Sequence, residues 1–265
     1  MAKSKKTTKK AAKKPSFAEL EREVSLALKA SNKETEQKGE RLLSGVKGLD
    51  GLLNGGIPSK TLTIVAGSCG TGKSTLGLQF LHQGASQGDA GLLISLEDEP
   101  SDVMERVKSF DWQWGDLMKK KKLFVSKPDA YDFKVLKELI EDHVERFNIK
   151  RVVIDPFSLI TAYFEKVYDA RKALSELQRD LRRWGCTAIV VMDVKEGEQT
   201  YSSTGYEEFV ADGVISMGVV LHKETGAFVR TILVRKMYGI PHSLRLTPFE
   251  IDKEGLVVHF GAEVF

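Results

Sequence analysis

Cysteine is almost absent from this chain of 265 residues, which contains only Cys69 and Cys186. Two cysteines so far apart build neither a disulfide framework nor a cysteine-based metal site. No apolar run approaches the roughly 18 residues that a bilayer-spanning helix needs. The basic N-terminus also lacks the apolar segment of a secretory signal. With 42% hydrophobic and 29% charged residues, the composition predicts a globular, cytoplasmic protein without a membrane span.

Acidic and aromatic residues are missing from residues 1–15, which hold seven lysines. The whole chain has a net charge of only +3, so the remainder is mildly acidic. A basic tail on an acidic body predicts an arm for an anionic partner such as nucleic acid. The alternative is a disordered, solubilising tail. Residues 16–40 are predicted to form an amphipathic helix and a polar linker, because Ser16 and Glu19 form a capping box.

A glycine-rich segment follows the first strongly apolar run, Leu62 to Ala66, and precedes a helical pattern. It fits the phosphate-loop pattern G-x-x-x-x-G-K-[ST] in the strand–loop–helix context that the pattern requires. The glycines let successive N–H groups turn toward an anion, and the helix adds its positive end. We therefore predict an ATP site, whose residues are Gly67, Ser68, Cys69, Gly70, Thr71, Gly72, Lys73, Ser74 and Thr75. Lys73 is expected to contact the β and γ phosphates, and Ser74 is expected to bind Mg²⁺.

Apolar strands alternate with amphipathic helices from Thr61 to Leu221. Strands that are apolar throughout are typical of a parallel sheet with helices on both faces. From Thr231 to Phe260 strands follow one another without helices, with a turn at residues 252–255. The fold class is therefore predicted as α/β, with a mostly parallel sheet flanked by helices and antiparallel strands at the C-terminal edge. Residues 41–265 are predicted to form this single domain.

Polar residues at the ends of the apolar strands are the remaining site candidates, because ligands bind at the carboxyl ends of parallel strands. Asp155 is predicted to hold Mg²⁺ through water, beside Ser74. Glu97, with Asp98 second, is predicted to orient and deprotonate the attacking water. The alternatives are a helix cap or ion pair for Asp155, and a favourable helix-dipole position for the two acids. Asp193 and Lys195 are candidates for sensing the γ-phosphate or for a surface ion pair.

Several motifs occur together in one order: residues 44–50, 52–58, the phosphate loop, 96–100, the strand ending at Asp155, 205–215 and 236–242. In this respect the chain resembles the KaiC/RadA branch of the RecA-type ATPases, particularly single-domain KaiC-like proteins of archaea. The resemblance implies that Glu97 and Asp98 form the catalytic acidic pair and that Asp155 is the Walker B residue. It also implies a homo-oligomeric ring, with a hexamer as one candidate, or a filament, in which Lys236 reaches the neighbour's γ-phosphate.

One position departs from the family pattern. The family has an arginine two residues after the lysine that corresponds to Lys236, and this chain has Tyr238 there. An arginine finger contributes about 10³–10⁵ in rate where it is used, and a tyrosine cannot supply its charge. Arg235 is a candidate substitute. We therefore predict a slow, Mg²⁺-dependent ATPase whose nucleotide state controls self-assembly or partner binding. The alternatives are a DNA-binding recombinase paralogue, which would use the lysine tail and residues 196–205, and a non-hydrolysing ATP-bound scaffold or switch.

Overall fold

The computed structural model describes residues 40–195, 197, 201–202, 204–222 and 226–262. The chain divides into two units, Met1–Gly39 and Glu40–Phe265. The lysine-rich tail and the segment predicted as an amphipathic helix therefore lie outside the described residues. Within the described part of the chain, no helix combines the length and the apolar character that crossing a bilayer requires.

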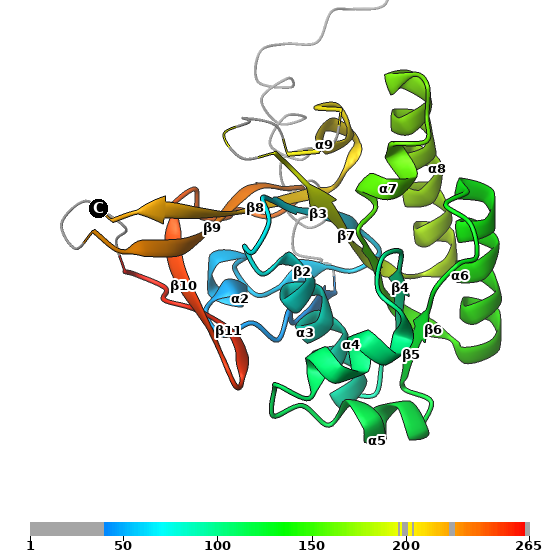
Figure 1. Cartoon of the computed structure of the whole chain (residues 1–265), viewed down its shortest axis with the longest axis horizontal. Helices are drawn as coiled ribbons and strands as arrows, with labels where there is room; N and C mark the ends of the chain where they lie inside the picture. The colour runs from blue at the N-terminus through cyan, green and yellow to red at the C-terminus, as the bar shows by residue number, and fades with distance from the viewer. Residues whose placement is uncertain (1–39, 196, 198–200, 203, 223–225, 263–265) are drawn as a thin grey trace, which may run out of the picture. The chain divides into compact units, whose positions relative to one another are not determined.

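A nine-stranded sheet forms the centre of the second unit, in the order β11-β10-β9-β8-β3-β7-β6-β4-β5 (Figure 1). The parallel strands are β3 (Leu62–Gly67), β4 (Ala90–Ser95), β5 (Leu123–Ser126), β6 (Ile149–Asp155), β7 (Thr187–Asp193) and β8 (Gly213–Leu221). The antiparallel strands are β9 (Phe228–Met237), β10 (Thr247–Asp252) and β11 (Gly255–Val258). The predicted mostly parallel sheet with an antiparallel C-terminal edge is confirmed.

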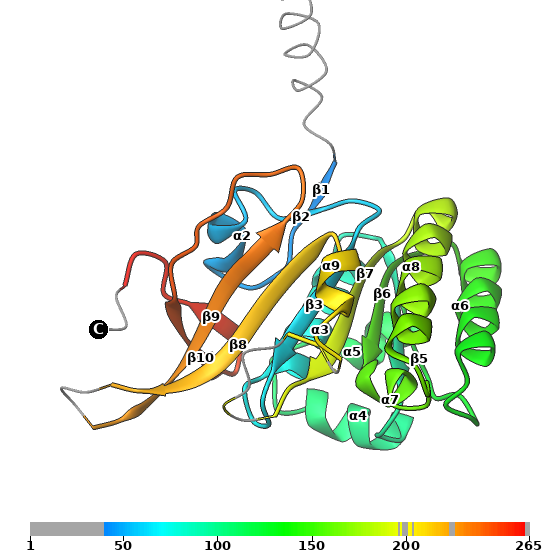
Figure 2. The same cartoon turned by 90° about the horizontal axis from the view of Figure 1, so that it is seen from above.

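Helices cover both faces of the parallel strands because successive strand residues point to opposite faces. In β3, Ile64 packs into one core and Val65 into the other. The Val65 core is closed by α3 (Lys73–Ser86), α4 (Pro100–Val107) and α5 (Trp114–Lys119). The Ile64 core is closed by α6 (Phe133–Phe147), α7 (Ser158–Thr161) and α8 (Val167–Trp184). Figure 2 shows α6 and α8 side by side over β6 and β7.

Local sequence signals account for both ends of α6. Asp132 caps α6 by accepting hydrogen bonds from the amides of Lys134 and Val135, at 2.8 and 3.0 Å. Asn148, in the left-handed region, ends the same helix. The sequence also favours Ser101 as the cap of α4, because serine is a common capping residue, but this prediction is wrong. Pro100 is already the first helical residue, because its fixed φ suits that position and it has no N–H to satisfy.

Four short elements complete the fold: β1 (Arg41–Leu42), β2 (Ile57–Pro58), α2 (Leu49–Leu52) and α9 (Glu207–Val210). A buried arginine connects the first of these to the sheet. Arg151 of β6 is 1% exposed and donates to the carbonyls of Leu43 and Phe80 and to the Asp89 carboxylate. A Cβ at Gly84 would lie 2.2 Å from the Arg151 Nε atom, so only glycine fits against this side chain.

Candidate functional site

The loop between β3 and α3 has the geometry of an anion-binding nest. Gly70 and Gly72 have φ angles of +74° and +89°, which turn neighbouring amides toward one side. A Cβ at Gly67 would lie 2.3 Å from the Met217 carbonyl oxygen, so glycine is required where the loop leaves the sheet. The helix that follows begins at Lys73 and points its positive end at the same place.

Lys73 is the buried cation of this loop, with 7% of its surface exposed. Its Nζ atom donates to the Ser68 carbonyl at 2.9 Å and pairs with the Asp193 carboxylate at 3.2 Å. The other carboxylate oxygen of Asp193 accepts a hydrogen bond from the Ser158 hydroxyl at 2.7 Å. Asp193 ends β7, next to β3, and so provides the negative charge that faces the Lys73 ammonium.

Asp155 lies where β6 ends, and the Ser74 hydroxyl hydrogen-bonds to its carboxylate. Burial, which the hydrogen bond with Ser74 opposes and the nearby Asp193 reinforces, raises the pKa of Asp155 from 3.8 to about 6. The two residues offer a hydroxyl and a carboxylate side by side. Oxygen donors of this kind are those that Mg²⁺ prefers, so the pair fits the metal.

The two acids that follow β4 are separated by the structure. Glu97 is exposed and lines the same cavity as Lys73 and Asp155. Asp98 instead forms an ion pair with Arg106 of α4, and it does not line this cavity. Only Glu97 of this pair is therefore placed to face a bound phosphate chain.

A cavity of about 700 Å³ connects these groups at the carboxyl ends of β3, β4, β6 and β7. Its lining residues are Cys69, Gly70, Lys73, Ser74, Glu97, Asp155, Pro156, Asp193, Val194, Lys195 and Ser202. Of these, Pro156, Val194 and Ser202 were not predicted as site residues, and neither was the Ser158 hydroxyl that holds Asp193. Ser158 lies three residues beyond a strand end that had already been singled out, so a search of the next turn would have found it.

Lys236 lies outside this cavity. Its Nζ atom donates to the Ala211 carbonyl at 2.6 Å and to the carbonyls of Glu208 and Phe209 at 3.4 Å. It therefore binds carbonyls at the end of α9 within its own chain, and would have to leave them to reach a neighbour.

The two residues beside Lys236 also lie away from the cavity. The Tyr238 side chain is 75% exposed. Arg235, the candidate substitute for the missing arginine, stacks on the Tyr201 ring with 4.6 Å between its guanidinium carbon and the ring centre. It lines a neighbouring cavity of about 590 Å³ that also includes Lys195.

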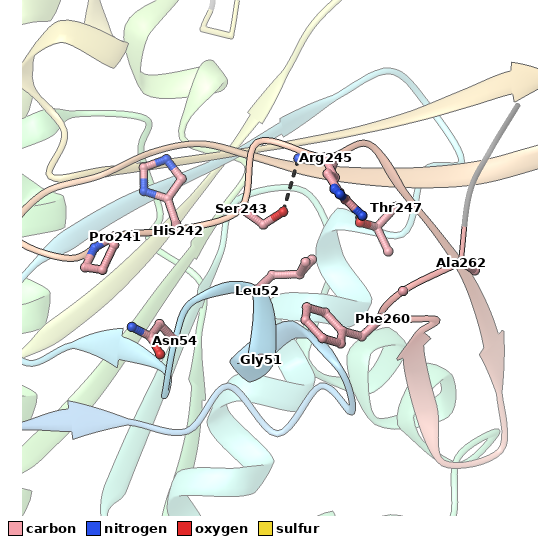
Figure 3. Close-up of a pocket in the computed structure, with 11 residues that line it drawn as sticks. Gly51, Leu52, Asn54, Pro241, His242, Ser243, Arg245, Thr247, Phe260 and Ala262 are labelled. Carbon is pink, nitrogen blue, oxygen red and sulfur yellow. Dashed lines mark hydrogen bonds between the residues drawn. The ribbon is translucent and has the colours of Figure 1, made fainter.

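Another cavity, of about 420 Å³, lies between α2, residues 241–247 and residues 260–262 (Figure 3). Leu52 and Phe260 give it an apolar side, and Arg245 lies across from them. His242, the last residue of the 236–242 motif, also lines it. This cavity shares no lining residue with the phosphate-loop cavity.

A nest of amides, a buried lysine and a strand-end carboxylate on a RecA-type sheet define a P-loop ATPase. A family model described as "ATPase: KaiC" matches residues 42–263. The chain belongs to this family of KaiC ATPases.

Named relatives support the same assignment. A UPF0273 protein of Thermotoga maritima is 32% identical over 239 residues, covering 83% of this chain and 96% of that protein. The circadian clock oscillator protein KaiC of Prochlorococcus marinus is 31% identical over 230 residues, covering 83% of this chain and 46% of that protein. The crystal structure of a KaiC-like protein from Pyrococcus horikoshii superposes with a TM-score of 0.75 at 32% identity, covering 83% and 99% of the two chains. The predicted resemblance is thus confirmed.

Proposed function

We propose that this protein hydrolyses ATP slowly in the presence of Mg²⁺, and that its nucleotide state controls self-assembly. The observation that carries the proposal is that Lys73, Ser74, Asp155 and Glu97 all line one cavity. Lys73 and Ser74 follow β3, Glu97 follows β4 and Asp155 ends β6. The four groups therefore lie at the carboxyl ends of parallel strands, where ligands bind. Membership of the KaiC ATPase family supports ATP as the nucleotide.

In this proposal the loop amides and Lys73 bind the phosphates, and Lys73 exchanges its pair with Asp193 for the γ-phosphate. Ser74 and Asp155 would hold Mg²⁺, which would neutralise charge on the β and γ phosphates. The carboxylate of Glu97 orients a water molecule toward the γ-phosphate and accepts its proton. Asp98 has only a supporting role in catalysis, because its carboxylate forms an ion pair with Arg106.

The absence of an arginine at position 238 is the reason to expect slow turnover. Lys236 is the first candidate for contact with a neighbour's γ-phosphate, with Arg235 as the second, and releasing Lys236 would cost its bonds to the carbonyls at the end of α9. Assembly into a ring or filament would supply that neighbour. Light scattering with and without ATP and Mg²⁺ tests this part of the proposal. The same molar mass in the two conditions would contradict it.

Glu97→Gln tests the hydrolytic part, with Asp98→Asn as the matched control. We expect Glu97→Gln to bind ATP normally and to lose about 10²–10⁴ in turnover, which is the usual contribution of a general base. Asp98→Asn should retain most of the turnover. If neither the wild type nor the variants release phosphate, the protein is an ATP-bound scaffold or switch. If Glu97→Gln turns over like the wild type, Glu97 is not the base.

A further inference from the structure

The carboxylate of Glu97 has no support of its own. No side chain among the described residues forms a hydrogen bond or an ion pair with it. Glu97 also lies outside β4, in the turn that leads to α4. The place of this carboxylate in the cavity therefore depends on what holds the backbone of the turn.

Within the described part of the chain, three hydrogen bonds hold the backbone of residues 96–98 in that turn. The Leu96 amide donates to the Asp155 carbonyl at 2.8 Å, which links the turn to the neighbouring strand. The Ser95 hydroxyl donates to the Asp98 carbonyl at 2.7 Å. The Lys127 ammonium donates to the Glu97 carbonyl at 2.8 Å. Only the last of these acts directly on the residue that carries the proposed base.

Lys127 contacts this turn from the end of the neighbouring strand. It follows β5, the edge strand that pairs with β4 in parallel, so its side chain emerges at the same end of the sheet. The same ammonium also pairs with the Glu99 carboxylate at 2.7 Å. One cation thus connects the turn to the sheet at positions 97 and 99.

The two contacts of Lys127 differ in what they contribute. The Glu99 side chain is 60% exposed, and pairs of this kind add little to stability. The bond to the Glu97 carbonyl is also exposed and of similar length, but it acts on the backbone of the residue that carries the proposed base. Its main consequence is geometric, because it removes the freedom of the Glu97 backbone to move away from the cavity.

We propose that Lys127 is a positioning residue for ATP hydrolysis, which fixes the Glu97 backbone so that the Glu97 carboxylate stays over the attacking water. This inference rests on the proposed role of Glu97 as the base. Because Lys127 does not line the cavity, we do not expect it to contact the nucleotide or the attacking water. It lies outside the cavity lining, so its removal should leave ATP binding intact.

Lys127→Met in the full chain tests the inference, with turnover, ATP affinity and melting temperature measured together. Misplacing a catalytic group by about 1 Å can cost 10²-fold, so we expect kcat to fall about 10- to 100-fold. The affinity for ATP and the melting temperature should stay at wild-type values. Lys127→Arg, which keeps a donor and its charge, should restore much of the loss.

Two controls separate the contacts. Lys134→Met makes the same chemical change at an 84% exposed lysine that pairs with Glu138 on α6, and should leave kcat unchanged. Glu99→Gln removes the charged partner but leaves the bond to the Glu97 carbonyl, so turnover should stay within about threefold of the wild type. An equal loss in Glu99→Gln and Lys127→Met would overturn the assignment to the Glu97 carbonyl.

The double variant distinguishes a failure of this inference from a failure of the proposed function. If Lys127 acts through Glu97, adding Lys127→Met to Glu97→Gln should cause no further loss. If Glu97→Gln is inactive while Lys127→Met turns over normally, the positioning role is wrong and the base is unaffected. A fall in melting temperature and ATP affinity along with kcat would show a general structural role instead. Normal turnover by Glu97→Gln would reject the proposed base itself.

Discussion

Asp155→Asn should stabilise the protein when neither nucleotide nor metal is bound. The carboxyl group of Asp155 is buried, and burial raises its pKa from 3.8 to about 6. A neutral asparagine of nearly the same shape carries no such penalty. The shift of about two pKa units corresponds to about 3 kcal/mol. Because the new amide nitrogen has to find a partner of its own, we expect a net gain of about 1 to 3 kcal/mol at pH 8.

The sign of the pH dependence follows from which state, folded or unfolded, keeps the Asp155 carboxyl group protonated to the higher pH. Between pH 3.8 and about 6 the folded protein keeps Asp155 protonated, whereas the unfolded chain has lost that proton. The contribution of this group to the free energy of unfolding is therefore fully present below pH 3.8. It is lost as the pH rises through about 6. The advantage of Asp155→Asn over the wild type should be near zero at pH 4 and complete at pH 8.

Urea unfolding in EDTA at pH 4, 6 and 8 measures this difference directly. Asp129→Asn, at an exposed carboxylate, is the control and should match the wild type at each pH. Adding Mg²⁺ and ATP should stabilise the wild type more than Asp155→Asn, because the asparagine has no charge to offer the metal. A variant that is no more stable than the wild type at pH 8, or equally more stable at pH 4 and pH 8, would refute the reasoning.

Three further changes test other contacts of the site. Asp193→Ala should raise the affinity for ATP about threefold to tenfold by calorimetry, because it frees Lys73 and removes a charge that repels phosphate; weaker binding would contradict this. ATP should protect Cys69, which is exposed in the loop, from alkylation by a maleimide, and an unchanged rate would place the phosphates elsewhere. Gly84→Ala should destabilise the protein by about 2 to 4 kcal/mol in urea unfolding, since its Cβ displaces the buried Arg151. A loss below about 1 kcal/mol would show that Arg151 can move aside.

The sheet and the phosphate loop were predictable because their signals are local. Continuous apolar runs between amphipathic helices marked the strands, and the loop pattern joins a strand to a helix within fifteen residues. Short elements were missed for the opposite reason. The single-turn helices α7 and α9 carry too few residues to show a helical period. The six-residue α5 begins at Trp114, whose burial depends on packing against other helices.

From the sequence alone, the site residues could be predicted only where each stands at the end of a predicted strand. That rule selected Glu97, Asp155 and Asp193, which the fold gathers around one cavity. It ranked Glu97 above Asp98 only because Glu97 is closer to the strand, and it could not show that Asp98 pairs with Arg106, eight residues later. It also missed Lys127, thirty positions from Glu97, since their contact exists only because β5 pairs with β4.

The charge balance of the cavity connects these observations. Asp155 and Asp193 interact unfavourably, and this repulsion raises the pKa of Asp155. The Lys73 ammonium relieves it in part by pairing with Asp193. A bound triphosphate would take the Lys73 ammonium away from Asp193 and add negative charge to the cavity. Its binding would therefore increase the electrostatic repulsion on both carboxylates unless a cation bound with it. A cavity with these charges is therefore suited to a nucleotide that arrives with its metal, and the same carboxylates that lower the stability of the empty site favour the loaded one.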